Sequence, residues 1–202
     1  MSFLKITIFL ISLLAIQPRL KTILFFGDSL TAGFGLSSVD KAFPAQLEKE
    51  LSKSNRPVKV INAGLSGETS AGGLSRIDWV LRQPIDVFIL ELGANDGLRG
   101  LPLDQTKKNL QAIIDKVKSK YPKAKIVLAG MMVPPNMGKS YSDEFKKVYP
   151  DLAVKNKCDL IPFLLEDVGG DEKLNQADGI HPNDEGHKII AKKLARFFEK
   201  II

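Results

Sequence analysis

Five short apolar runs, several of them rich in β-branched residues, alternate along this chain with longer segments of helical periodicity. Runs of this kind are typical of strands that are buried on both faces of a parallel sheet. Because strand–helix alternation implies right-handed crossovers, the chain is predicted to have an α/β fold. The expected architecture is a three-layer α/β/α sandwich around a five-stranded, mainly parallel sheet. The runs are residues 22–26, 58–61, 85–92, 125–129 and 160–163.

Helical periodicity is clear in four other segments. In the first, Phe43, Leu47 and Leu51 recur every four residues and would share one helix face. The others are residues 110–117, 145–152 and 189–201. A length of 202 residues with 44% apolar residues suits one globular domain, and no repeat or linker divides it. We therefore expect a single domain over residues 21–202.

The N-terminal segment, residues 1–20, is set apart from this domain. Lys5 precedes an apolar run, residues 6–16, that is too short to span a bilayer comfortably but suits the core of a secretory signal. No clean Ala-x-Ala cleavage site follows the run. We expect a signal peptide on an exported protein, periplasmic or secreted, with an uncleaved N-terminal membrane anchor as the alternative.

The charge of the chain gives weak information about partners. The net charge of +6 falls to +4 without residues 1–20, which carry Lys5 and Arg19 and no acid. The remaining lysines are scattered, so they indicate a solvated surface and no nucleic-acid partner, although transient contact with a membrane surface fits the positive charge. Cys158 is the only cysteine, which excludes an internal disulfide and a thiolate metal site. We expect Cys158 to be a small buried side chain.

Polar or glycine-containing clusters follow each of the first four apolar runs. In open α/β sheets, ligands bind outside the carboxyl ends of the strands, so these clusters are expected to meet along one edge. A fifth cluster, around Asp178 and His181, lies between the last run and the final helical segment and can reach the same edge. The first four clusters are residues 27–29, 62–64, 93–96 and 131–138.

Ser29, Asp178 and His181 supply a nucleophile, an orienting acid and a general base. An aspartate can orient an imidazole, which takes the proton of a serine hydroxyl and activates it for attack on an ester. Each residue alone also has a structural interpretation: a capping serine in a Gly-Asp-Ser turn, a loop histidine, and an Asp-Gly turn. Their joint placement at strand ends favours the catalytic interpretation.

An ester hydrolase also needs donors for the oxyanion that develops on the carbonyl oxygen. The candidates are the backbone N–H groups of Ser29 and Gly64 and the side-chain amide of Asn95, although Asn-Asp-Gly is also ordinary turn chemistry. His187, the second histidine, follows His181 by six residues, which is no recognised metal spacing. We expect His187 on the surface of the final helix, and no metal site.

Four sequence blocks together resemble those of the SGNH, or GDSL-type, hydrolases. The resemblance implies a flavodoxin-like fold and a serine esterase without metal or organic cofactor, with Ser29, Asp178 and His181 as the catalytic triad. It also implies an oxyanion hole of Ser29, Gly64 and Asn95. The segments 93–100 and 134–138 are most similar to exported bacterial acyl-CoA thioesterases, lysophospholipases and arylesterases. The blocks are Gly27-Asp28-Ser29-Leu30, residues 62–69, residues 93–100 and Asp178-Gly179-Ile180-His181-Pro182.

Apolar residues in the loops at the carboxyl edge of the predicted sheet indicate a hydrophobic groove for an acyl group, unless they only pack the loops together. The expected partner is therefore a small-molecule acyl ester or a lysophospholipid, since an exported enzyme would rarely meet cytosolic acyl-CoA. Two alternatives remain: a carbohydrate acetylesterase, and a non-catalytic domain that cradles a phosphate at helix N-termini. The candidate substrate-binding residues are Leu98, Leu101, Met132, Val133, Pro134, Pro135, Met137 and Ile180.

Overall fold

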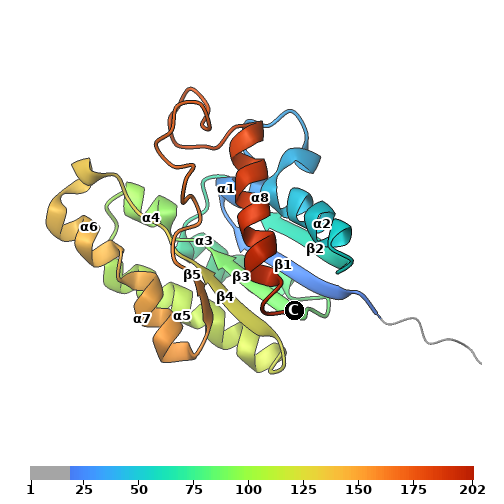
Figure 1. The fold of residues 1–202 in the computed structure, drawn as a ribbon. Helices are drawn as coiled ribbons and strands as arrows, with labels where there is room; N and C mark the ends of the chain where they lie inside the picture. Colours follow the sequence, from blue (N-terminus) through green and yellow to red (C-terminus); the bar gives the residue numbers. More distant parts are fainter. Residues whose placement is uncertain (1–18) are drawn as a thin grey trace, which may run out of the picture.

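The computed structural model describes residues 19–202 and places five strands in one sheet (Figure 1). The strand order is β2-β1-β3-β4-β5, and every neighbouring pair is parallel. The chain moves from β1 outward to β2 and returns to β3 on the other side of β1, as in flavodoxin-like doubly wound sheets. This confirms the predicted fold class. The strands are β1 (Lys21–Gly27), β2 (Val58–Gly64), β3 (Val87–Glu91), β4 (Lys125–Ala129) and β5 (Asp159–Ile161).

Helices cover both faces of the sheet and complete the three layers (Figure 1). On one face, α2 (Phe43–Lys53) packs against α8 (Asp184–Phe198). On the other face lie α3 (Ser70–Val80), α5 (Leu103–Lys120) and α7 (Val148–Asn156), each packed against the next.

Strand β1 supplies alternate phenylalanines to the two hydrophobic layers, as the two-residue period of a strand requires. Phe25 packs edge-on against Phe43 of α2, with ring centroids 5.4 Å apart. Phe26 points to the opposite face, where its ring lies 5.8 Å from that of Phe88 and close to Gly73 of α3. The central strand is thus buried on both sides, which explains its continuous apolar run.

Short helices fill the connections between the main elements. α1 (Ser29–Ala32) and α4 (Ala94–Leu98) begin just after β1 and β3. α6 (Lys139–Phe145) ends before α7 begins, so the predicted helical segment 145–152 is divided between two helices, although its apolar residues are buried. Two 3₁₀ turns, η1 (Val39–Lys41) and η2 (Pro135–Met137), complete the described elements.

The expectation of a surface-exposed His187 is wrong. His187 lies on the inner face of α8, is 1% exposed, and stacks on the Phe43 ring at a centroid distance of 5.9 Å. Its Nδ1 atom accepts the Phe43 N–H at 3.1 Å. Because the first N–H groups of a helix have no partner within the helix, His187 satisfies one of those at the start of α2.

Within residues 19–202, no helix is both long and apolar enough to span a bilayer. The expected signal peptide or anchor, residues 1–20, falls almost entirely outside the described residues. Cys158 is half-buried just before β5 rather than fully enclosed.

Candidate active site

The carboxyl ends of β1, β2 and β3 lie level with one another. Gly27 pairs with Gly64 on one side and with Glu91 on the other. Residues that follow these strands therefore meet at one edge of the sheet, as expected for a parallel register. Ser29 begins α1 at this edge, and Asp28 caps that helix by accepting the Leu30 N–H at 3.0 Å.

His181 reaches Ser29 from a loop 152 residues further along the chain. Its Nε2 atom lies 2.9 Å from Ser29 Oγ, and its Nδ1 atom lies 2.7 Å from Asp178 Oδ2. The other carboxyl oxygen of Asp178 accepts the backbone N–H groups of Ile180 and His181 at 2.9 and 3.0 Å, which holds the loop in shape. The fold thus brings the three predicted triad residues into one hydrogen-bonded row.

The ionisation of Asp178 suits this arrangement. Partial burial opposes ionisation, but hydrogen bonds from the backbone and ring of His181 and from the Ile180 backbone lower the pKa of Asp178 to about 2. The carboxylate is therefore charged near neutral pH and accepts a hydrogen from Nδ1 of His181. That tautomer leaves Nε2 as the acceptor that faces the Ser29 hydroxyl.

Two residues that the sequence did not single out hold the His181 loop. Gln176 donates its backbone N–H to the His181 carbonyl at 2.7 Å and its side-chain amide to the Phe34 carbonyl at 2.7 Å. The Phe34 ring lies against the His181 imidazole, with centroids 4.7 Å apart. Because Phe34 closely follows α1, these contacts couple the loop to the segment that carries Ser29. No short motif marks either residue.

Asn95 lies in the first turn of α4, which begins after Gly93 in a left-handed conformation with φ of 110°. Its side-chain amide donates to Asp28 Oδ2 and to the Glu68 carbonyl, both at 3.0 Å. Both amide hydrogens therefore have acceptors. Burial raises the pKa of Asp28 to about 6, although hydrogen bonds to its carboxylate act in the opposite direction. Asn95 is thus held near Ser29 by Asp28, the residue that precedes it.

One of the predicted oxyanion donors, the backbone N–H of Gly64, already has an acceptor in the structure. This N–H donates to Asn62 Oδ1 at 3.0 Å. A Cβ atom at Gly64 would lie 2.3 Å from a backbone nitrogen of α1, so glycine is required there for close packing of β2 on α1. Gly67 has a φ of 79°, and its N–H has no acceptor within residues 19–202. It adjoins Glu68, whose carbonyl holds Asn95, and is the better candidate donor.

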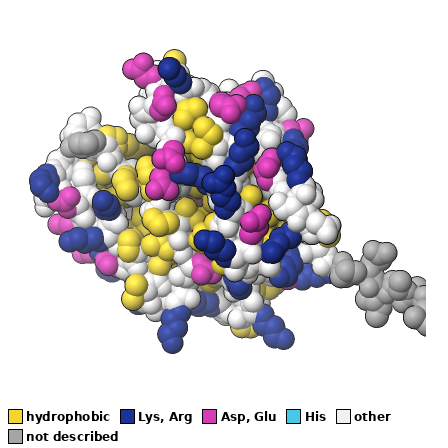
Figure 2. Space-filling model, in the orientation of Figure 1, with side chains coloured by type: hydrophobic (Ala, Val, Ile, Leu, Met, Phe, Trp, Pro, Cys, Tyr) yellow, Lys and Arg dark blue, Asp and Glu magenta, His cyan; other side chains and the backbone are white. Residues whose placement is uncertain are grey.

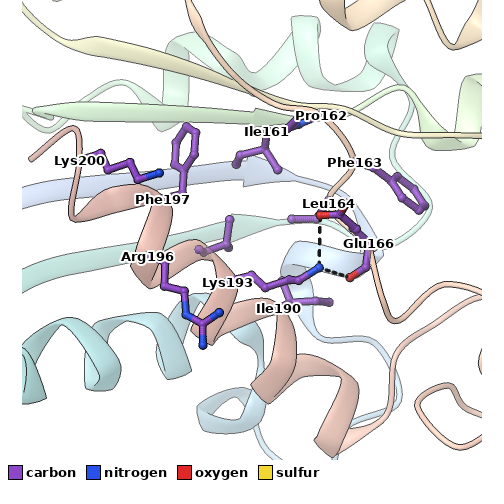
Figure 3. Close-up of a pocket in the computed structure, with 11 residues that line it drawn as sticks. Ile161, Pro162, Phe163, Leu164, Glu166, Ile190, Lys193, Arg196, Phe197 and Lys200 are labelled. Atoms are coloured by element: carbon purple, nitrogen blue, oxygen red, sulfur yellow. Dashed lines mark hydrogen bonds and ion pairs between the residues drawn. The ribbon is translucent and has the colours of Figure 1, made fainter.

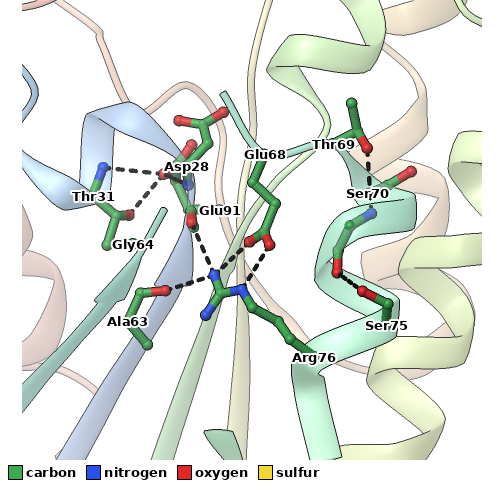
Figure 4. Close-up of polar contacts among 12 residues, drawn as sticks. Asp28, Thr31, Ala63, Gly64, Glu68, Thr69, Ser70, Ser75, Arg76 and Glu91 are labelled. Atoms are coloured by element: carbon green, nitrogen blue, oxygen red, sulfur yellow. Dashed lines mark hydrogen bonds and ion pairs between the residues drawn. The ribbon is translucent and has the colours of Figure 1, made fainter. Parts of the chain in front are cut away.

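An ion pair braces the segment that carries Gly67 (Figure 4). Arg76 of α3 pairs with Glu68, whose side chain is almost fully buried, and donates to the Ala63 carbonyl at 2.8 Å. These bonds tie α3 to the end of β2. The turn between β2 and α3 is therefore fixed on the side that approaches Asn95.

The predicted substrate-binding residues lie in different environments. Pro134 is exposed, Met137 is partly buried against the core, and Pro135 begins η2. Val133 is buried beside Gly97, where a Cβ atom would come within 2.4 Å of it, so this side chain packs the core. Four large apolar residues are each at least 37% exposed: Leu98, Leu101, Met132 and Ile180.

Grooves lie along both edge strands of the sheet. The groove between β2 and α3 has a volume of about 640 Å³ and begins at Gly64, beside the site, with Trp79 along its wall. The groove between the end of β5 and α8 has a volume of about 280 Å³ and includes none of the predicted site residues (Figure 3). Lys193 of α8 crosses it and donates to the Glu166 carbonyl at 3.0 Å. Figure 2, in the same orientation as Figure 1, shows apolar side chains exposed beside lysines and arginines.

The described part of the chain has no cluster of three or more His, Cys, Asp or Glu side chains that could hold a metal ion. The polar groups that do meet at the site are a hydroxyl, an imidazole, carboxyls and an amide. A nucleophile bonded to a base, with the base bonded to an orienting acid, is the arrangement that acyl transfer requires.

Comparison with known proteins agrees with this geometry. Residues 25–189 match the model of the GDSL-like Lipase/Acylhydrolase family. The chain is 41% identical over 171 residues to the esterase TesA of Pseudomonas aeruginosa, with 84% of each chain covered. It is 37% identical over 197 residues to the thioesterase 1/protease 1/lysophospholipase L1 of Escherichia coli strain K12, with 96% of this chain and 91% of that protein covered.

A solved structure extends the likeness to three dimensions. The psychrotrophic esterase EstA from Pseudoalteromonas sp., solved in a form inhibited by monoethylphosphonate, matches with a TM-score of 0.83 and 33% identity. The match covers 89% of this chain and 97% of that one. The predicted family and the predicted class, an ester-hydrolysing enzyme, are therefore confirmed. The chain belongs to the GDSL-like lipase/acylhydrolase family.

Proposed function

We propose that the protein hydrolyses acyl esters through an acyl-enzyme formed on Ser29. His181 Nε2 takes the hydroxyl proton while Oγ bonds to the carbonyl carbon and an electron pair moves onto the carbonyl oxygen. Collapse of this intermediate breaks the bond to the alcohol or thiol, which receives the proton from His181. Water then attacks the acyl-enzyme in the same way and releases the acid and Ser29. The observation that carries this proposal is the row from Ser29 Oγ through His181 to Asp178, with contacts of 2.9 and 2.7 Å.

The oxyanion is held, in this proposal, by the N–H groups of Ser29 and Gly67 and by the Asn95 amide. Gly67 is preferred to Gly64 because Gly64 packs against the backbone of α1, whereas Gly67 is open and its N–H has no acceptor within residues 19–202. Asn95 must give up one of its two present acceptors to bind the oxyanion. Asn95→Ala is expected to lower kcat by about 10²–10³-fold, or roughly 3–4 kcal/mol. A decrease below about threefold would remove Asn95 from the mechanism.

The proposed substrates are small acyl esters, thioesters and lysophospholipids. An apolar acyl group is supported by four exposed side chains that form a hydrophobic surface at the loops: Leu98, Leu101, Met132 and Ile180. The relatives named an esterase and a thioesterase/lysophospholipase support the same class. A lysophospholipid would be reached by transient contact with a membrane surface, which the positive net charge favours.

A fluorophosphonate probe tests the nucleophile directly. We expect one label per wild-type chain and none on Ser29→Ala, because the probe bonds to an activated serine. Ser37→Ala, which alters an exposed serine, is the matched control and should label like the wild type. Labelling that survives Ser29→Ala, or a folded wild type that does not label, would overturn the proposal.

A chain-length series of p-nitrophenyl esters tests the acyl group. We expect kcat/KM to rise from acetate to butyrate and longer chains, because each buried methylene adds about 0.8 kcal/mol of favourable transfer. A sharp preference for acetate would favour the carbohydrate acetylesterase alternative instead.

We further propose that residues 1–20 direct export of the domain. The apolar run 6–16 after Lys5 supports this proposal. Fractionation of bacterial cells that express the full chain, with N-terminal sequencing of the product, tests it. A shortened chain in the periplasm or medium is expected, a full-length chain in the membrane fraction favours the anchor, and a full-length chain in the cytosol contradicts export.

A further inference from the structure

A buried carboxyl group lies directly beneath the turn that carries Ser29. Glu91 ends β3 in register with Gly27 and is fully buried. Within residues 19–202 it has no Lys, Arg or His partner, and its Oε1 atom accepts no hydrogen bond. Burial of a carboxyl group without a cation is unfavourable for folding. A buried carboxyl group without a cation, next to the turn that carries Ser29, is therefore expected to have a function.

The other oxygen of Glu91 gathers three donors from the nucleophile turn (Figure 4). Oε2 accepts the Asp28 N–H at 3.2 Å, the Thr31 N–H at 3.3 Å and the Thr31 hydroxyl at 2.7 Å. These residues flank Ser29 on both sides. The two backbone donors belong to the start of α1, where N–H groups have no partner inside the helix. One oxygen atom therefore fixes both ends of the short segment from which Ser29 projects.

The neighbouring residues leave room for this carboxyl group. A Cβ atom at Gly27 would lie 2.3 Å from Glu91 Oε2, so any other residue at this position would displace it. Burial and then the nearby charge of Asp28 raise the pKa of Glu91 well above its ordinary value. The raised pKa favours the protonated acid, which can still accept all three hydrogen bonds at Oε2. A neutral group at this position places no second negative charge next to Asp28.

We propose that Glu91 is a positioning residue for the nucleophile: its Oε2 atom holds the Asp28–Thr31 turn and so sets the direction of Ser29 Oγ and the Ser29 N–H. The same turn carries Asp28, whose carboxyl group accepts from the Asn95 amide. Glu91 therefore acts on the nucleophile and on the oxyanion donors through a single segment, without touching the substrate. This inference rests on the proposed role of Ser29.

The closing experiment compares Glu91→Ala, which removes the acceptor, with Glu91→Gln, whose amide oxygen can replace Oε2. Glu91→Ala is expected to lower kcat for a short p-nitrophenyl ester by about 100-fold with KM changed less than about threefold, because a misplaced nucleophile loses near-attack geometry. Glu91→Gln should recover kcat to within about fivefold of the wild type. The rate of fluorophosphonate labelling should fall and recover in parallel.

A second pair of variants keeps the test decisive if Glu91→Ala does not fold. Thr31→Val removes the hydroxyl donor without changing the shape of the side chain, and Thr31→Ser retains it. We expect a kcat loss of about tenfold for Thr31→Val and a near-normal kcat for Thr31→Ser. Urea unfolding of each variant shows whether the loss follows stability instead.

Several outcomes would overturn the proposal: a folded Glu91→Ala with normal kcat, a Glu91→Gln as impaired as Glu91→Ala, or an effect on KM alone. These outcomes are distinct from a failure of the proposed function. In that case Ser29→Ala itself would remain active or the wild type would not label.

Discussion

The two histidines lie six residues apart in the chain but in opposite kinds of environment. His181 lies in the loop before α8, in contact with Asp178 and Ser29, and its side chain is 18% exposed. His187 lies within α8 and is 1% exposed. The Nδ1 atom has opposite roles in the two rings: it donates to a carboxylate in His181 and accepts the Phe43 N–H in His187.

The neighbour at Nδ1 decides what each imidazole can do. A carboxylate there leaves Nε2 of His181 ready to take a proton from Ser29. A backbone donor there requires an unprotonated Nδ1. Burial lowers the pKa of His187 to about 4, against the attraction of Asp184, so this ring is neutral near pH 7. One histidine is thus set up for proton transfer and the other for packing.

Replacement of His181 should have the largest effect on activity, because this ring is the proposed general base. His181→Asn is expected to lower kcat by about 10⁴-fold or more, because the members of a triad act as a unit. Its free energy of unfolding should fall by only about 1–2 kcal/mol, the loss expected for a mostly buried loop side chain that packs against Phe34. Steady-state kinetics with p-nitrophenyl butyrate and urea unfolding measure the two quantities. A loss of less than about 100-fold would end the assignment of His181 as the base.

Replacement of Asp178 changes only the group that faces Nδ1 of His181. Asp178→Asn is expected to lower kcat by about 10⁴-fold, because the amide can donate to Nδ1 and favour the wrong tautomer. His181 would then resemble His187, which also accepts a hydrogen at Nδ1. Activity within tenfold of the wild type would show that the carboxylate does not set the tautomer.

Replacement of His187 should affect stability and not chemistry. His187→Ala is expected to lower the free energy of unfolding by about 3 kcal/mol, since it leaves a cavity and an unpaired Phe43 N–H. The kcat of the folded protein should stay within about twofold. Lys188→Ala, at the exposed neighbouring position, is the control and should change stability by less than about 0.5 kcal/mol. A kcat loss like that of His181→Asn would show that His187 also takes part in the chemistry.

The smallest expected effect is the pH dependence of the stability that His187 provides. Its folded pKa of about 4 lies below the ordinary 6.5, so the contribution is complete above pH 6.5 and is lost as the pH falls toward 4. Between pH 8 and pH 5 the gap in unfolding free energy between the wild type and His187→Ala should narrow by roughly 2 kcal/mol. Urea unfolding at several pH values measures the gap.

Only the difference in unfolding free energy between the wild type and His187→Ala isolates the contribution of His187. The pKa of Asp28 is raised to about 6, so this group stabilises the fold at low pH and loses that contribution as the pH rises through about 6. The effects of Asp28 and His187 oppose each other in the wild type. A gap that stays constant from pH 8 to pH 5 would show that His187 titrates as it does in the unfolded chain.

The sequence was sufficient to predict the strands, the layers and the family, because short buried runs and strand-end polar clusters are local signals. It also identified Ser29, Asp178 and His181, which the fold brings into contact. The predictions that depended on packing between distant segments were less successful. His187 carries a helical pattern that fits either face of α8, and only the position of α2 makes its face an inner one.

Other features of the site were hidden from the sequence for similar physical reasons. The turn after β2 contains Gly64 and Gly67, and spacing alone does not say which N–H lacks an acceptor. Val133 follows Met132 in a loop whose side chains alternate between core and surface. Glu91 was hidden within the apolar run 85–92, although a carboxylate at the end of a buried strand is itself a signal that could have been used.

In the proposed mechanism, the two acceptors of the Asn95 amide let the enzyme discriminate between a neutral ester and an oxyanion. A neutral ester carbonyl is a weaker acceptor than the Asp28 carboxylate and would compete poorly for the amide hydrogen. A full negative charge on the same oxygen can compete. The Asn95 amide would then leave Asp28 only as the reaction approaches its transition state. Its hydrogen bond to the oxyanion would raise kcat without tightening the binding of unreacted ester.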